Sequence, residues 1–385
     1  MRQTSDTQSE DGYAIRAYQP GDADRFRSLY ESVWGTTKSA EWFDWRFAAN
    51  PHADGIEMIV AEDDGLLVGA EPVIPYRLRA GERLLSAWQP VDWIVHPEYR
   101  REGIFSAMTE ALLDTVRGDT DLLYNFPNEQ LLPGIQQFDW QVIDTVATRY
   151  RVQDPATAAG LRDAHMAESA SSRLAIAASP LLQAGLGLCD RFVATHDDIT
   201  VQRVQGLPLE IVSERYEASV PSQLHVPRDR RFLEWRFANP RWHITTYVAR
   251  RDGDVGATVV AATERIGGSK LVRLLDVQPM TEAEGDADAF EAILQAVVSD
   301  NRDASVLKAP TGPFPGVLRR CGFLRDDSFP FSRFSATTFH AVRPLEGGSV
   351  VAAAEDDGSV ASDPDALDPR NADDWLLALG DLDVA

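Results

Sequence analysis

Apolar and polar residues alternate in two similar stretches of the chain, each interrupted by an Asp-Gly pair. Residues 58–74 read MIVAEDDGLLVGAEPVI, and residues 246–262 read TYVARRDGDVGATVVAA. Alternation on both sides of an Asp-Gly turn is typical of two strands joined as a β-hairpin. The pattern therefore predicts one hairpin in each half of the chain.

The two hairpins belong to a longer repeat. Upstream of them, WFDWRFAANP at residues 42–51 recurs as FLEWRFANP at residues 232–240. Downstream, WIVHP at residues 93–97 corresponds to LDVQP at residues 275–279, and LPGIQQFDW corresponds to FPGVLRRCGF. Similar segments in the same order indicate two related units.

Strands and helices alternate within the first unit. The strand patterns include SAWQPVDWIVHP, LLYNF and WQVIDTVATRYRV, and the helical patterns include FRSLYESVW, AEWFDWRFA and NEQLLPGIQQF. This order is typical of a mixed sheet flanked by helices. The predicted fold class is α/β, with two such domains in tandem.

The domain layout follows from the repeat and from composition. We predict a disordered tail over residues 1–11, a first domain over 12–154, a helical connector over 155–198, a second domain over 199–344, an acidic disordered linker over 345–370, and a C-terminal segment over 371–385 that docks on a domain.

Charge narrows the range of partners. The chain has 60 acidic and 37 basic residues, a formal net charge of -23, and only three lysines, Lys38, Lys270 and Lys308. An anionic surface with few ammonium groups is typical of proteins from salt-loving cells, although a GC-rich genome also favours arginine over lysine. Duplex nucleic acid is a disfavoured partner because phosphates require a basic surface.

Other features point to a cytoplasmic protein. Cys189 and Cys321 have no CxxC spacing, and the first residues have no apolar core of a signal peptide. The longest apolar stretch, residues 174–189, is interrupted by Pro180 and is too short to span a bilayer, so no membrane partner is expected. The Asp-rich linker lacks a calcium-loop spacing, and no metal site is predicted.

One strand leads directly into a polar loop and then an amphipathic helix, in DWIVHPEYRREGIFSAM at residues 92–108. The amides at a helix start have no intrahelical partner and lie at the positive end of the helix dipole, so they bind diphosphate well. Gly103 allows close approach of the main chain, and Arg100 and Arg101 add positive charge. The segment predicts a diphosphate site.

These residues resemble motif A of the GNAT superfamily of acyl-CoA-dependent N-acyltransferases. Arg100 and Gly103 match two fixed positions of its Arg/Gln-x-x-Gly-x-Gly/Ala loop, whereas Phe105 stands where a small residue is usual. The resemblance covers residues 13–152 well and 200–341 weakly. The second unit has acidic TEAEGDADAF where the loop is expected, which implies a degenerate copy.

The resemblance implies acetyl-CoA or another acyl-CoA as the cofactor. The residues that it assigns to CoA are Ile94, Val95, His96, Arg100, Arg101, Glu102, Gly103, Ile104, Phe105, Ser106 and Asn128. Asn128 also suits the position of a helix cap.

Acyl transfer from a thioester requires a neutral amine, a stabilised oxyanion and a protonated leaving thiolate. The resemblance implies that a main-chain N–H of Val95 or its neighbour stabilises the oxyanion. Asp92, His96 and Glu71 are candidate bases, and Asp92 has an alternative role as a hydrogen-bonded strand residue. Tyr124 is the candidate acid, with a buried core role as the alternative.

The leading hypothesis is an N-acyltransferase, most simply an N-acetyltransferase, that acts on a small-molecule or peptide amine by direct attack. Two alternatives stay open: a tandem-GNAT aminoacyl or peptidyl transferase that uses charged tRNA, and a non-catalytic CoA-binding sensor. The sequence does not distinguish acceptors, or a monomer from a homodimer.

Overall fold

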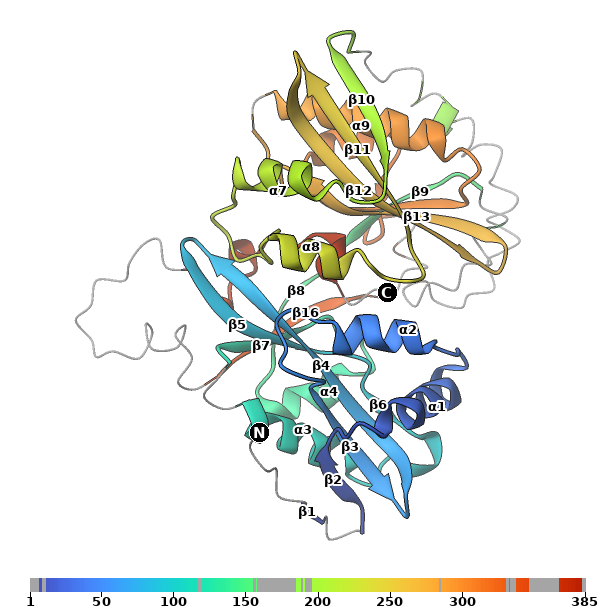
Figure 1. Cartoon of the computed structure of the whole chain (residues 1–385), viewed down its shortest axis with the longest axis vertical. Coiled ribbons are helices and arrows are strands. Elements are labelled where there is room, and N and C mark those ends of the chain that lie inside the picture. Colours follow the sequence, from blue (N-terminus) through green and yellow to red (C-terminus); the bar gives the residue numbers. More distant parts are fainter. Residues whose placement is uncertain are drawn as a thin grey trace, which may run out of the picture.

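The computed structural model describes residues 7–8, 12–116, 120–154, 157, 185–187, 190, 196–283, 285–329, 332, 337–345 and 367–382. It contains two α/β units, one above the other in Figure 1. Most of the predicted tail (1–11), connector (155–198) and acidic linker (345–370) lies outside the described residues.

The first sheet is built mainly from the first half of the chain. Its order is β1 (Thr7–Gln8), β2 (Ala14–Ala17), β3 (Met58–Asp63), β4 (Leu66–Ala80), β5 (Arg83–Pro90), β7 (Leu122–Asn125), β16 (Phe339–Pro344) and β8 (Gln141–Thr145), while β6 (Ile94–Val95) also pairs with β4. Among the described strands of this sheet, only the β5–β7 pair is parallel.

Helices cover both faces of this sheet. α1 (Asp22–Trp34) and α2 (Ala40–Phe43), which continues as a π-helical turn (Asp44–Ala48), pack on one face. α3 (Ile104–Val116) and α4 (Leu132–Ile135) pack on the other. The apolar residues at alternate strand positions divide between these two cores, which is why each face needs its own helices.

The second sheet repeats this arrangement. Its order is β10 (Ile199–Gln205), β11 (His243–Arg251), β12 (Asp254–Ile266), β13 (Ser269–Gln278), β14 (Val306–Pro310), β9 (Thr148–Val152) and β15 (Leu324–Arg325). α9 (Asp286–Asp300) and α10 (Pro315–Arg320) pack on one face, and α7 (Leu209–Glu217) and α8 (Arg230–Arg236) on the other. The two mixed sheets flanked by helices confirm the predicted fold class.

The two units exchange a strand. β9 follows β8 in the chain but inserts into the second sheet between β14 and β15, and β16 inserts into the first sheet between β7 and β8. Each predicted domain, 12–154 and 199–344, therefore gives its last strand to the other sheet. The sequence pattern missed this exchange because it marks a strand without indicating which sheet contains it.

The two copies of the WRF motif meet between the sheets. The indole N–H of Trp45 donates to the carbonyl of Trp235, and that of Trp235 donates to the carbonyl of Trp45, both at 2.7 Å. The rings stack with centroids 6.4 Å apart. A reciprocal contact of this kind is typical of interfaces related by two-fold symmetry. It gives the repeated tryptophan a packing role in both units.

The C-terminal segment completes the same interface. Trp375, Leu379 and Leu382 are buried in the core that both units share. The carboxylate of Asp381 lies 2.9 Å from the guanidinium of Arg228, which also binds Asp276 at 2.6 Å, and all three side chains are buried. The segment is thus held by apolar packing and by a buried ionic group.

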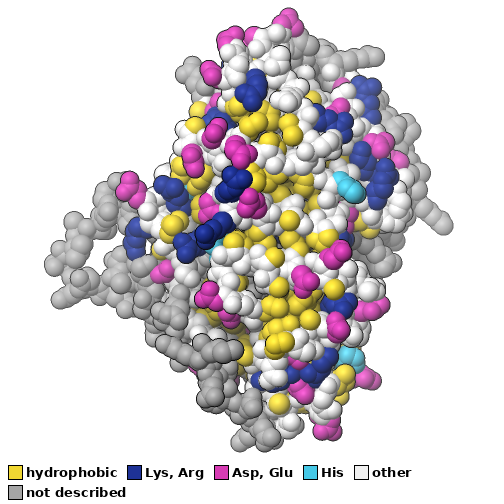
Figure 2. Space-filling model, viewed as in Figure 1, with side chains coloured by type: hydrophobic (Ala, Val, Ile, Leu, Met, Phe, Trp, Pro, Cys, Tyr) yellow, Lys and Arg dark blue, Asp and Glu magenta, His cyan; other side chains and the backbone are white. Residues whose placement is uncertain are grey.

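Charged side chains of both signs are mixed on one face of the molecule. On the face shown in Figure 2, small groups of Lys and Arg lie among Asp and Glu over both units. Among the described residues, no helix has the length and apolar composition needed to cross a membrane.

One buried carboxyl group joins α3 to the first sheet. Glu71 of β4 has no exposed surface, and the hydroxyl of Thr109 in α3 donates to it at 3.1 Å. Burial raises the pKa of this carboxyl to about 8, and the hydrogen bond from Thr109 offsets only part of that rise. Glu71 is therefore protonated at neutral pH in the folded chain.

We predict that Trp235→Phe lowers the free energy of unfolding by about 1–3 kcal/mol, because it leaves the buried carbonyl of Trp45 without its donor. Trp242→Phe is the matched control, since Trp242 lies in the same core and its indole has no hydrogen-bond partner among the described residues. Denaturant unfolding measures both changes. Equal losses in the two variants would contradict the role of the reciprocal bonds.

We predict that Glu71→Gln makes stability less sensitive to pH between about pH 5 and pH 8. In this range the folded chain keeps the Glu71 proton and the unfolded chain releases it, so wild-type stability falls as pH rises. The contribution is at most about 1.4 kcal/mol per pH unit, and the amide abolishes it. Unfolding curves at both pH values test this; identical pH dependence in the two proteins would rule it out.

Candidate functional site

The strands β5 and β7 separate near the middle of the first sheet. They share only the pairs Ala87 with Leu122 and Trp88 with Leu123. Beyond these two pairs, β7 forms hydrogen bonds with β16, and β6 forms hydrogen bonds with β4. The main chain of β6 therefore has a sheet neighbour on one side only.

One extra residue causes the break between β5 and β6. Pro90 of β5 pairs with Val73, and Ile94 of β6 pairs with Ala70. The chain therefore advances four residues from β5 to β6 while β4 advances three. This is the geometry of a β-bulge. Asp92 within it has φ of 46°, a left-handed backbone conformation that is rare outside glycine.

The hydrogen-bonding pattern directs the amide of Val95 away from β4. The N–H of His96 donates to the carbonyl of Val68 at 2.9 Å, and Val95 is opposite Gly69. Hydrogen-bonded and non-hydrogen-bonded pairs alternate along antiparallel strands, so the N–H and carbonyl of Val95 point to the side where β7 has diverged. The Nε of Arg100 donates to that carbonyl at 3.2 Å.

The loop after β6 ends at the start of α3. Arg101 and Gly103 have positive φ of 70° and 77°, which turn the chain into the helix. The first helical hydrogen bond runs from Ala107 N to Gly103 O at 3.0 Å. The amides of residues 104–106 therefore have no intrahelical acceptor, and Arg100, Arg101 and Gly103 beside them are exposed.

The two unusual loop residues have local partners. Glu102 accepts a hydrogen bond from the hydroxyl of Tyr13, which holds its carboxylate. The ring of Phe105 packs edge-on against Trp93 and Phe138, with centroids 5.7 Å and 6.3 Å away. A Cβ at Gly134 would lie 3.0 Å from this ring, so Gly134 makes the space that Phe105 occupies. This compensation was not visible in the sequence.

Asn128 and Tyr124 both have structural contacts. The Oδ1 of Asn128 accepts from the N–H groups of Gln130 and Leu131 at 3.1 Å and so caps the turn that leads into α4. Tyr124 has no exposed surface, and its hydroxyl has no hydrogen-bond partner among the described residues. Burial raises the pKa of this phenol well above its ordinary value.

The three candidate bases lie in different surroundings. Asp92 faces α2 and its π-helical turn, where its carboxylate binds Nε of Arg46 at 2.9 Å. Glu71 lies on the opposite face, under α3. His96 lies near the loop, and its Nδ1 accepts from the N–H of Glu98 at 3.4 Å. The structure therefore brings Asp92, Val95 and the loop together at one strand and separates Glu71 from them.

Sequence reasoning missed one cation on the Asp92 face, because Lys38 was counted only in the composition. Lys38 is the lysine nearest to the aromatic residues of α1 and α2, with its ammonium 4.6 Å from the centroid of the Trp42 ring. Its rarity in this arginine-rich chain was the available signal.

The corresponding loop of the second unit is occupied by its own acidic side chains. Glu282 accepts from the N–H of Phe314 at 2.9 Å, and Asp286 and Asp288 lie in the first turn of α9. These carboxylates oppose binding of a diphosphate. Among the described residues, no group of three or more His, Cys, Asp or Glu side chains is arranged to hold a metal ion.

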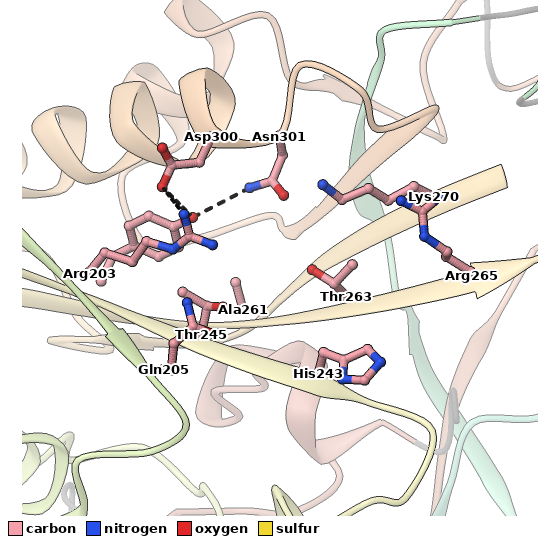
Figure 3. Close-up of a pocket in the computed structure, with 11 residues that line it drawn as sticks. Arg203, Gln205, His243, Thr245, Ala261, Thr263, Arg265, Lys270, Asp300 and Asn301 are labelled. Atoms are coloured by element: carbon pink, nitrogen blue, oxygen red, sulfur yellow. Dashed lines mark hydrogen bonds and ion pairs between the residues drawn. The ribbon is translucent and has the colours of Figure 1, made fainter.

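The second unit also has a polar cavity of about 240 Å³ at the other end of α9 (Figure 3). Its charged groups have partners: Arg203 lies 3.5 Å from Asp300, and Lys270 lies 2.7 Å from Asp303. The hydroxyl of Tyr247 donates to Asp300 at 3.1 Å. The cavity is formed by the second sheet and α9 and does not include the loop of the first unit.

Residues 14–143 match the acetyltransferase (GNAT) domain family, a segment that includes the bulge, the loop and α3. No curated protein matches the chain.

Solved structures share the fold over most of the chain. The GCN5-related N-acetyltransferase from Anabaena variabilis has a TM-score of 0.55 at 10% identity, over 86% of this chain and 72% of that chain. The one from Kribbella flavida has 0.52 at 15% identity, over 88% and 73%. The N-myristoyltransferase of Saccharomyces cerevisiae, solved with myristoyl-CoA, has 0.57 at 12% identity, over 89% and 83%.

At these identities the structures establish a shared fold and no more. The chain has a GNAT-like fold, and its residues 14–143 match the acetyltransferase (GNAT) domain family.

Proposed function

We propose that the chain is an N-acyltransferase that moves an acyl group, most simply acetyl, from acyl-CoA to a primary amine by direct attack. The observation that carries the proposal is the combination of an outward-facing Val95 amide with the unpaired amides at the start of α3. The Val95 amide suits a thioester carbonyl, and the amides at the start of α3 suit a diphosphate.

In this proposal, the loop between β6 and α3 forms the cofactor site. The amides of Ile104, Phe105 and Ser106 bind the diphosphate, with Arg100 and Arg101 neutralising its charge. Gly103 allows the main chain to turn into the helix. Ile94, Val95 and His96 line the pantetheine arm, and Asn128 adds a contact besides its capping role. Tyr13 supports this arrangement by binding the carboxylate of Glu102.

We assign catalytic roles from the surroundings of each candidate group. The N–H of Val95 stabilises the oxyanion as the amine attacks the thioester carbonyl and the C–S bond breaks. Asp92, whose side chain is 15% exposed, takes the ammonium proton directly or through water. Glu71 is a poor base because it is enclosed and protonated at neutral pH, so we assign it to the packing of α3.

Tyr124 is assigned to the core in this proposal. It packs against Tyr76, Phe126 and Trp375 at centroid distances of 5.7–5.9 Å. Protonation of the leaving thiolate is therefore left to solvent. This assignment also favours the alternative function, a CoA-binding sensor without turnover, because Tyr124, the candidate acid, is enclosed in the core.

We also propose that the two units arose by duplication and that the second no longer binds CoA. The matching sheet orders and the reciprocal contact of Trp45 with Trp235 support the duplication. Glu282 and the acidic start of α9 support the loss. The net charge of -23 supports a salt-rich cytoplasm as the working environment.

We predict that Arg100→Ala weakens acetyl-CoA binding by about tenfold or more, because a charge-assisted contact is lost. Thermal stabilisation by acetyl-CoA measures this. Arg230→Ala is the control, since Arg230 is also an exposed arginine but lies in the second unit, where it pairs with Glu210. The loop assignment fails if both variants bind like wild type.

We predict that Asp92→Asn lowers kcat for thiol release about 100-fold with little change in acetyl-CoA binding, because the base is lost. Glu71→Gln, the control on the other face of the sheet, keeps most of its kcat. Full activity of Asp92→Asn, or a larger loss in Glu71→Gln, would reverse the assignment. Acetyl-CoA binding without thiol release for any amine in wild type would favour the sensor.

A further inference from the structure

The sheet face that α9 covers changes from apolar to polar where the helix ends. Alternate residues of a strand share a face. In β11, Ala249 and Tyr247 are buried against α9. The next residues of β11 on this face are Thr245 and His243. The strands β10 and β12 change in the same way, and the polar residues that they add to this face are Arg203, Gln205, Thr263 and Arg265.

This polar surface lines the cavity of about 240 Å³ together with Lys270 of β13 and the end of α9. In Figure 3, Asn301 and Lys270 lie on one side of the space, and Thr245 and Thr263 lie on the other. Ala261 also lines the cavity, and its small side chain leaves room beside Thr245, its cross-strand neighbour. Because a cavity of about 150 Å³ already holds a benzene ring, this one has room for a small ring compound.

Buried hydrogen bonds fix the helix side of the cavity. Tyr247 and Asn301 are only 1% and 7% exposed. The hydroxyl of Tyr247 donates to the carboxylate of Asp300 at 3.1 Å. The Nδ2 of Asn301 donates to the carbonyl of Val297 at 2.8 Å and to the hydroxyl of Tyr247 at 3.4 Å. The polar groups at the end of α9 therefore have set orientations.

Cations gather on the strands that face these groups. Arg265 and Lys270 are directly opposite each other in the register of β12 and β13. Like charges at opposite positions destabilise a pair of strands unless an anion compensates them. The described carboxylate that pairs with both is Asp303, at 3.7 Å from Arg265 and 2.7 Å from Lys270. One carboxylate compensates two cations here, so a further anion is favoured.

A third cation adds to this charge. Arg203 lies 3.5 Å from Asp300, whose carboxylate already accepts the hydrogen bond from Tyr247. The lining thus has three formal positive charges and one negative charge, although the whole chain has a net charge of -23. A concave positive region on an anionic protein attracts small anions.

Four further polar side chains of the lining have no hydrogen bond or ion pair with a described residue. They are Gln205, His243, Thr245 and Thr263. Hydroxyl, amide and imidazole groups can each donate and accept hydrogen bonds. Such groups suit the hydroxyls of a sugar or another polyol.

We propose that this cavity is a second binding site, whose ligand is a small hydroxylated oxyanion, a sugar that bears a carboxylate or a phosphate. Arg203, Arg265 and Lys270 bind the oxyanion, and the polar side chains beside them bind the hydroxyls. The lining residues all belong to the second sheet and to the end of α9. The inference therefore does not depend on acyl transfer by the first unit.

The test measures binding by calorimetry to the full-length chain without acyl-CoA. The probes are D-glucuronate and D-glucose 6-phosphate, with D-glucose as the neutral sugar and acetate and inorganic phosphate as oxyanions without a sugar. Arg265→Gln and Lys270→Met remove cations of the cavity. Arg325→Gln is the matched control, since Arg325 is an exposed arginine of the second unit that pairs with Asp327 outside the cavity.

Wild type and the control are expected to bind one sugar anion about tenfold or more tightly than D-glucose, and Arg265→Gln and Lys270→Met to lose about tenfold in affinity. The preferred probe distinguishes carboxylate from phosphate. Arg265 is 66% exposed, so its variant keeps the test valid if Lys270→Met does not fold. Failure of both sugar anions to bind more tightly than D-glucose, or unchanged affinity in Arg265→Gln, overturns the inference.

A second variant tests the polar side chains. Thr263→Val removes one hydroxyl of the lining and keeps the shape of the side chain. It is expected to weaken the sugar anion several-fold and to leave the bare oxyanion unaffected. A bare oxyanion that binds wild type as tightly as its sugar would show that the cations attract ions only, and the sugar site would be rejected.

Discussion

The extra residue between β5 and β6 is the constraint on which the site depends. Without this residue, β6 would continue the register of β5 along β4. Val95 would then lie one position away from Gly69, its present partner. A shift of one residue reverses the direction of every amide and side chain in a strand. The bulge thus sets the direction of the Val95 amide and turns Asp92 toward Arg46.

The strand β6 and the bulge before it also contact elements that hold the two units together. On one face, α3 packs so closely that a Cβ on Gly69 would lie 3.0 Å from Ile104 and Met108. On the other face, Arg46 of the π-helical turn binds Asp92, and the adjacent Trp45 exchanges hydrogen bonds with Trp235 of the second unit. Strand exchange, the paired tryptophans and the C-terminal segment hold the two units together. The surroundings of Asp92 therefore depend on both units.

Sequence reasoning reached the fold class and the sequence of elements because hairpins, amphipathic helices and the repeat leave local patterns. It also found the loop, whose Arg100 and Gly103 are adjacent in the chain to the helix that they precede. It did not find which sheet takes β9 or β16, because a strand pattern carries no information about its partner.

Features that depend on distant residues were missed for the same reason. The space for Phe105 comes from Gly134, and the partner of Glu102 is Tyr13. Glu71 looked like a candidate base because it follows a hairpin strand, but its surroundings are set by Thr109 of a helix.

The most direct measurement of the central claim is a crystal structure of the chain with acetyl-CoA. We predict diphosphate oxygens within hydrogen-bonding distance of the amides of residues 104–106, and the thioester carbonyl facing the N–H of Val95. Coenzyme A bound at another surface, or a Val95 amide bonded within the sheet, would contradict it.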